Sequence, residues 1–174
     1  VWVAGPSVAK GYYNKPELND IAFGNQLQNQ GGLFYRTGDL GFYHADELYI
    51  TGRIKDVIII RGRNLYPQDI ERCALKASED MAGSFAAAFS VQDKDTELLI
   101  IVVEVKGRPK EEQINALKDC IHAAVTTEFN VAPEQVVIGP QLTIPRTTSG
   151  KVQRFACKEA WLNNTLRSFR RSKK

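Results

Sequence analysis

The sequence predicts an α+β fold built around a small buried sheet. Two apolar runs, 84–91 and 97–105, flank the polar stretch 92–96, a pattern typical of two buried strands joined by a short loop. Apolar side chains recur at spacings of three and four over 110–129, which indicates an amphipathic helix covering the sheet. Residues 135–138 predict a further strand. We therefore expect a three-stranded sheet with flanking helices.

The first fifty residues predict a series of short strands. Residues 1–3 are strand-like, and 25–32 form a polar loop rich in Gln and Gly. Residues 33–36 read as a strand that enters the glycine turn 37–39. The apolar residues of 42–50 predict a hairpin around a polar turn.

A strand, a turn and a helix are expected next. Residues 57–60 are β-branched throughout and too few for a helix, and residues 61–64 supply the turn that ends the strand. The helix expected over 67–76 begins with a proline, whose missing N–H costs nothing in the first turn. Asp69 and Glu71 place carboxylates near this helix N-terminus, where negative charge is favoured.

Residues 144–151, IPRTTSGK, are small and polar, which predicts an exposed, mobile loop with Lys151 at its tip. This loop is not the phosphate-binding loop of nucleoside triphosphatases. Pro145 stands where that loop needs its first glycine, and Val152 stands where it needs Ser or Thr. The lysine must serve another purpose or be a solvated loop residue.

The C-terminal residues predict a helix followed by a basic tail. Residues 154–162 are expected to close the domain through Phe155, Ala156 and Trp161. Residues 167–174 carry five cations and no acid, which is more than the whole net charge of +3. The rest of the chain is slightly acidic, so no nucleic-acid-binding face is expected. The tail is expected to be a solvated end or linker, or a segment that attracts an acidic protein partner.

Composition narrows the class of protein further. The three cysteines are odd in number and widely spaced, which favours reduced, buried thiols over disulfides or metal ligands (Cys73, Cys120 and Cys157). Two histidines in the whole chain disfavour histidine-based metal or triad chemistry, and we expect no metal site. No apolar run approaches the roughly 20 residues of a membrane helix. We therefore expect a cytoplasmic protein without a membrane span.

Three motifs in order resemble the adenylate-forming enzymes, the superfamily of acyl- and aryl-CoA ligases, luciferases and peptide-synthetase adenylation domains. They are YRTGD at 35–39, GRIKDVIIIRGRNLYPQDIE at 52–71 and IPRTTSGKVQR at 144–154. Within the superfamily, RGRN followed by YPQDIE resembles the fatty acyl-AMP ligases more than the acyl-CoA ligases.

The resemblance implies a division into domains. Residues 1–52 would be the end of a large N-terminal adenylation domain, so the chain is expected to begin within that domain. Residues 53–166 would be the small C-terminal lid domain, and 167–174 a tail or linker. ATP and Mg²⁺ would be used by the intact enzyme, with the metal-binding acid upstream of residue 1. The segment alone is expected to be inactive.

The resemblance also implies site residues. Asp39 would accept hydrogen bonds from the ribose hydroxyls of ATP, and Arg53 would hold ribose or phosphate oxygens. Lys55 would be the hinge of the lid, and Gly62 would approach the thiol channel. Lys151 would touch the substrate carboxylate and the α-phosphate. Without the other motifs, Asp39 would be read as an Asx turn and Arg53 as an exposed turn residue.

The implied reaction joins a fatty acid to AMP and then to a thiol. The carboxylate would attack the α-phosphate of Mg-ATP, giving acyl-adenylate and pyrophosphate, and the acyl group would pass to the phosphopantetheine of an acyl carrier protein. Two alternatives stay open: a long-chain acyl-CoA ligase, whose acceptor is CoA, and a non-catalytic module that docks a carrier protein.

Overall fold

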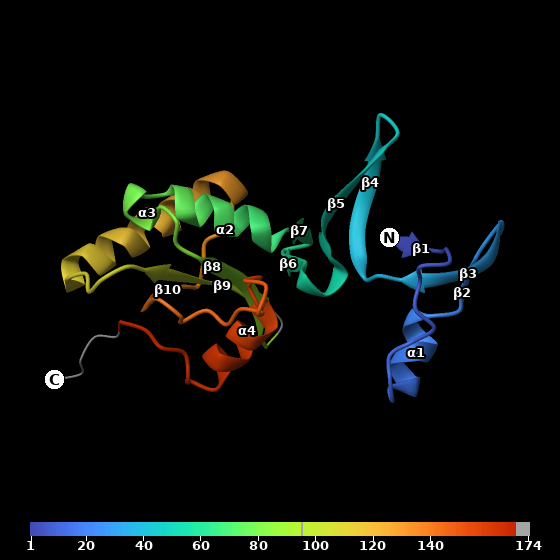
Figure 1. Cartoon of the computed structure of the whole chain (residues 1–174). Helices are drawn as coiled ribbons and strands as arrows, with labels where there is room; N and C mark the ends of the chain where they lie inside the picture. The colour runs from blue at the N-terminus through green and yellow to red at the C-terminus, as the bar shows by residue number, and fades with distance from the viewer. Residues whose placement is uncertain (95, 170–174) are drawn as a thin grey trace. The chain divides into compact units, whose positions relative to one another are not determined.

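The computed structural model describes residues 1–94 and 96–169 and shows two compact units, Val1–Lys55 and Asp56–Lys174 (Figure 1). Among these described residues, no helix has the length and apolar character needed to cross a membrane. The basic tail falls partly outside them, because residues 170–174 are not described.

The first unit consists of short antiparallel strands and one helix. A three-stranded sheet has the order β1-β3-β2, and a separate hairpin pairs β4 with β5. The stretch 25–32 was expected to be a loop, and this was wrong: it forms β2 and the start of β3, which turn at Asn29 with φ of 64°. Asparagine tolerates this left-handed conformation, which a tight turn between strands requires. The elements are β1 (Trp2–Val3), α1 (Pro16–Ala22), β2 (Asn25–Leu27), β3 (Gln30–Arg36), β4 (Asp39–His44) and β5 (Glu47–Arg53).

The hairpin predicted over residues 42–50 is confirmed. Its turn is the pair Ala45-Asp46, and both residues have positive φ, 49° and 62°. Two-residue turns of this kind match the twist of the flanking strands. The pairing runs from His44 opposite Glu47 to Asp39 opposite Arg53, at the far end of the hairpin.

The second unit is the predicted α+β fold with a hairpin and a three-stranded sheet. The sheet has the order β10-β9-β8, with β8 antiparallel and β10 parallel to β9. The helix α3 makes the crossover that the parallel pair needs. The elements are β6 (Ile58–Ile60), β7 (Arg63–Leu65), α2 (Pro67–Lys76), β8 (Ala86–Asp93), β9 (Thr96–Val105), α3 (Glu111–Phe129), β10 (Gln135–Pro140) and α4 (Arg154–Leu162). There are also two 3-10 turns, Ile54–Asp56 and Glu79–Met81. The first of these turns spans the boundary between the two units.

The expected turn 61–64 is shorter than the sequence suggested. Only Arg61 and Gly62 form it, because Arg63 and Asn64 pair with Ile60 and Ile59 as part of β7. The loop 92–96 is shorter for the same reason: Asp93 still pairs with Thr96 at the end of the β8–β9 hairpin.

The core lies on both faces of the three-stranded sheet. In Figure 1, α2 and α3 cover one face of this sheet and α4 covers the other. Alternate residues of β9 therefore enter different clusters: Leu99, Ile101 and Val103 pack with α2 and α3, whereas Ile100 and Val102 pack with α4. Burial on both faces explains why β9 reads as a continuous apolar run.

Of the side chains expected to close the domain from α4, Trp161 packs against the core, whereas Phe155 does not and Cys157 does so in its place. Phe155 is 76% exposed, whereas Cys157 is fully buried. These residues are two apart and so point to different sides of the helix. Trp161 is partly buried, and its indole N–H donates to Gln135 Oε1 at 3.0 Å.

The three cysteines are reduced, as expected, but only two are buried. Cys120 lies on the exposed side of α3, next to the buried Ile121. Burial raises the pKa of Cys73 to about 12, and a hydrogen bond to Glu128 adds to the effect. Burial also raises the pKa of Cys157 to about 12, with help from the charges of Glu71 and Glu104. Thiolates react and thiols do not, so both buried cysteines should be inert.

We predict that one cysteine of the native protein reacts rapidly with a disulfide reagent at about pH 8. Cys120→Ser should remove the fast phase, because Cys73 and Cys157 are buried and protonated at that pH. Counting the released chromophore before and after adding denaturant tests this, since unfolding should expose the other two thiols. A fast phase that survives in the variant would contradict the assignment.

Candidate functional site

Asp39 and Arg53 form an ion pair at the open end of the β4–β5 hairpin. Arg53 Nε donates to Asp39 Oδ1 at 3.2 Å. The Arg53 side chain is 69% exposed and that of Asp39 30%, so the pair is accessible to a ligand. The Asp39 carboxylate can accept hydrogen bonds from hydroxyls, and the planar Arg53 guanidinium can donate hydrogen bonds to nearby oxygens.

The turn before Asp39 fixes its backbone. Gly38 has φ of 77°, and its carbonyl accepts from Ile54 N at 2.9 Å. The Asp39 N–H donates to Thr37 Oγ1 at 3.0 Å. The Asp39 carboxylate bonds Arg53 rather than the backbone two residues on, so the turn is not an Asx turn of Asp39.

Lys55 and Gly62 lie in two different turns. Lys55 is exposed in the 3-10 turn Ile54–Asp56 and is the last residue of the first unit. Gly62 is in the β6–β7 turn with φ of 73°, and a Cβ placed on it would meet no atom within 4 Å. Glycine is therefore needed there for its backbone conformation, while the space above it is open.

We call residues 145–153 the lysine loop, and they form a narrow hairpin. Lys151 was expected at the tip, and this was wrong: the turn is at Thr148-Ser149, and Lys151 follows Gly150 on the returning arm. The hairpin is closed by a bridge between Arg146 and Val152 and by three backbone hydrogen bonds: Gln153 N to Pro145 O, Thr147 N to Lys151 O and Gly150 N to Thr147 O, each at 2.9 Å.

The backbone of Lys151 is fixed, while its side chain is exposed. Its N–H donates to Thr147 Oγ1 at 3.1 Å, and its carbonyl accepts from Thr147 N. Across residues 1–94 and 96–169, the structure gives its ammonium no hydrogen bond or ion pair. The loop therefore presents a cation that is available to a ligand.

A buried glutamate holds the first arm of the lysine loop. Glu104 on β9 is only 2% exposed. Its Oε1 accepts from Ile144 N at 2.8 Å, and its Oε2 pairs with Arg146 Nη2 at 3.5 Å. The guanidinium of Arg146 also lies 4.1 Å from the ring centre of Phe85. These contacts fix where the loop leaves the sheet.

A second buried glutamate holds the other arm, which no local sequence pattern indicated. Glu71 was expected to interact with the N-terminus of α2, but its buried side chain instead binds Arg154, the first residue of α4. Arg154 Nε and Nη2 donate to Glu71 Oε1 and Oε2, each at 2.7 Å, and Nη1 donates to Asp56 Oδ2 at 3.2 Å. Glu71 Oε1 also accepts from Ala88 N at 3.0 Å.

Two opposing effects act on the pKa of Arg154. Burial disfavours its charge and lowers the pKa, while the hydrogen bonds and charge of Glu71, with the charge of Asp56, raise it. The acidic partners prevail and the pKa of Arg154 is raised, so the guanidinium stays charged in the interior. Removing an acidic partner of this largely buried arginine would be destabilising, because it would leave an uncompensated charge.

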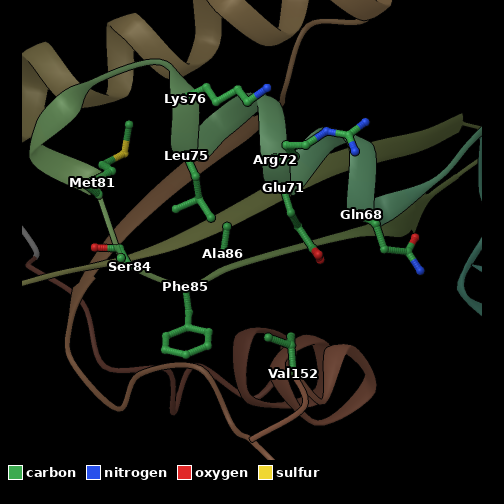
Figure 2. Close-up of a pocket in the computed structure, with 12 residues that line it drawn as sticks. Gln68, Glu71, Arg72, Leu75, Lys76, Met81, Ser84, Phe85, Ala86 and Val152 are labelled. Atoms are coloured by element: carbon green, nitrogen blue, oxygen red, sulfur yellow. The ribbon is translucent and has the colours of Figure 1, made fainter.

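A groove lies between α2 and the end of the lysine loop. It has a volume of about 420 Å³ and includes Leu75, Phe85 and Val152, with Arg72 and Lys76 on the α2 side. Figure 2 shows Glu71 projecting from α2 toward the segment that carries Val152. None of the five residues expected from the sequence to form the site lines this groove.

Of the five predicted site residues, the structure brings two into contact with each other, Asp39 and Arg53. Asp39 and Arg53 are in contact in the first unit, whereas Gly62 and Lys151 belong to the second. The described residues contain no group of three or more His, Cys, Asp or Glu side chains that could hold a metal ion.

Comparison with known proteins places the chain in a family. The sequence profile of the AMP domain of Disco-interacting protein 2-like proteins matches residues 55–171. A medium-chain-fatty-acid–[acyl-carrier-protein] ligase of Moorena producens, JamA, is 47% identical over 168 residues, covering 95% of this chain and 28% of that ligase. The chain thus spans less than a third of that relative.

Two solved structures are also similar to this chain. The fatty acid AMP ligase from Legionella pneumophila is 40% identical with a TM-score of 0.54, covering 96% of this chain and 29% of the ligase. The structure of McyG A-PCP complexed with phenylalanyl-adenylate is 36% identical with a TM-score of 0.76, covering 93% of this chain and 28% of McyG A-PCP.

We predict that Gly62→Ala lowers the free energy of unfolding of the second unit by about 1–2 kcal/mol, because a Cβ is disfavoured at positive φ. Gly62→Asn is the matched control and should lose less, because asparagine adopts this conformation more readily. Urea unfolding followed by circular dichroism measures both. Equal stability of Gly62→Ala and the unmodified protein would contradict the turn conformation.

Proposed function

Because the chain belongs to the family of Disco-interacting protein 2-like AMP domains, within the adenylate-forming enzymes, we propose that it is the C-terminal part of a fatty acyl-AMP ligase. The family resemblance of the three motifs is thereby confirmed. The intact protein activates a fatty acid with ATP to acyl-adenylate and passes the acyl group to a carrier-protein phosphopantetheine. The observation that carries this proposal is the available ammonium of Lys151 on a fixed backbone.

Lys151 is the proposed catalytic residue of adenylate formation. As a carboxylate oxygen attacks the α-phosphorus and pyrophosphate leaves, negative charge builds on the phosphorus-bound oxygens. A cation directed at these oxygens stabilises the transition state by roughly 2–4 kcal/mol. An ammonium without a partner in the described chain loses no existing ion pair when it binds them.

Asp39 and Arg53 are proposed to bind the nucleotide. Both ribose hydroxyls need acceptors, and the Asp39 carboxylate has two oxygens, of which Oδ1 meets Arg53. The exposed Arg53 fork has further N–H groups for ribose or phosphate oxygens. ATP is accompanied by Mg²⁺ in this proposal, and its ligands would come from the preceding large domain. A cytoplasmic location, where ATP is available, completes the proposal.

The lid is proposed to move about Lys55. Residues 1–52 would end the large domain and 53–166 would form the lid, and the compact unit that starts at Asp56 supports a lid beginning near this boundary. Swinging the lid would withdraw Lys151 after adenylation and bring the Gly62 turn to the thiol channel. The open space above Gly62 would admit a phosphopantetheine arm.

The acceptor is proposed to be a carrier protein, which is what the name of the Moorena producens relative states for that ligase. Arg167 is the only cation of the basic tail among the described residues, and it is exposed. An exposed cation there would favour an acidic carrier.

We predict that Lys151→Ala in the full-length protein slows pyrophosphate release with fatty acids by about 10²–10³-fold, the cost of one lost oxyanion donor. Lys106→Ala is the matched control, because Lys106 is also an exposed loop lysine of the second unit and should change nothing. An unchanged rate in Lys151→Ala would favour the non-catalytic docking module.

We predict that the full-length protein transfers the acyl group to a phosphopantetheinylated carrier protein and not to free CoA. Mass spectrometry of both acceptors, offered separately with ATP and the same fatty acid, distinguishes them. Apo carrier protein, which lacks the thiol, is the control and should stay unmodified. Efficient formation of acyl-CoA would assign the protein to the long-chain acyl-CoA ligases instead.

A further inference from the structure

One partly buried ionic network joins three distant parts of the second unit. Arg154 bridges Asp56, the last residue of the 3-10 turn Ile54–Asp56, and Glu71 on α2. The sequence separations are 98 and 83 residues, so the contacts are tertiary. The Arg154 side chain is only 17% exposed and that of Glu71 only 11%. A pair buried to this extent is little screened by salt.

The pair between Glu71 and Arg154 fixes direction as well as distance. Two parallel hydrogen bonds of 2.7 Å join the planar guanidinium to the carboxylate. This fork-to-fork geometry allows one relative orientation of the two groups. A third hydrogen bond, from Ala88 N, prevents the carboxylate from rotating. Arg154 is therefore held by the sheet and by α2 at once.

Arg154 directly follows the lysine loop in sequence. Arg154 follows Gln153, whose N–H donates to Pro145 O at 2.9 Å and closes the loop. Lys151 lies three residues before Arg154, and its backbone bonds only Thr147 across the hairpin. A rotation of the loop about its base would therefore displace the ammonium.

We propose that Glu71 is a positioning residue for Lys151, acting through Arg154 to fix the lysine loop in the orientation that adenylation requires. The proposal rests on the proposed function, in which Lys151 meets the reacting phosphate. Asp56 directly follows the proposed hinge residue Lys55 and is bonded to Arg154. A rotation at the hinge would therefore move the lysine loop together with Asp56.

A double-mutant cycle on pyrophosphate release by the full-length protein tests this. Glu71→Gln keeps the size of the side chain but turns an N–H₂ group toward the guanidinium, which breaks the two-bond pair. We expect adenylation to slow by about 10- to 100-fold, as misplacing a reacting group does. In the Lys151→Ala background, Glu71→Gln should change the rate by less than about twofold, because no ammonium remains to be positioned.

The two proposals fail in different ways. If Lys151→Ala alone has no effect, the proposed function of the lysine is wrong. If Lys151→Ala slows the reaction but Glu71→Gln slows it equally in both backgrounds, Glu71 has only a structural role and the positioning proposal is overturned. Ile121→Val, a core change on α3 remote in sequence from the loop, is the control for lost stability and should leave the rate unchanged.

Hydrogen exchange gives a readout that does not depend on activity. In Glu71→Gln, the amides of Thr147, Gly150 and Lys151 should exchange faster, while those of β9 should not. Unchanged exchange in the loop would overturn the proposal. If Glu71→Gln does not fold, Arg154→Lys replaces it in both experiments, because it keeps the charge and loses the fork. The same outcomes then apply.

Discussion

The structure of the second unit depends on a buried arginine that has two acidic partners. Arg154 would be costly to bury alone, and Glu71 would be costly without Arg154. Together they connect α2, the sheet and α4 by side-chain contacts. A single ion pair between the buried Glu104 and Arg146 holds the other arm of the lysine loop. The loop is thus polar and exposed in its middle and anchored by buried charges at both ends.

Much of the fold follows from local sequence patterns. The continuous apolar run of β9, the spacing of apolar residues in α3 and the proline at the start of α2 are each short-range signals, and each predicted its element. The bounds of the turns were less predictable. Whether Arg63 and Asn64 continue a strand depends on the partner strand, which a local pattern does not specify.

The candidate site was predictable only in part. The three motifs singled out Asp39, Arg53 and Lys151, and the structure adds the Asp39–Arg53 pair and the fixed backbone of Lys151. The roles of Glu71 and Glu104 could not be predicted, because their arginine partners are 83 and 42 residues away. A glutamate in the first half of a helix is explained locally by its interaction with the helix dipole. That local explanation gave no reason to expect a tertiary ion pair for Glu71.

The hydrogen bond from Ala88 N to Glu71 has a consequence for solubility. β8 is the outermost strand of the three-stranded sheet, and its free side offers unpaired backbone groups on which strands of other molecules can aggregate. Glu71 occupies one of these donors with a charged side chain. On the opposite margin, Phe169 N bonds Ile138 O of β10. On each margin of this sheet, one backbone group is therefore bonded by the chain itself and cannot pair with a strand of another molecule.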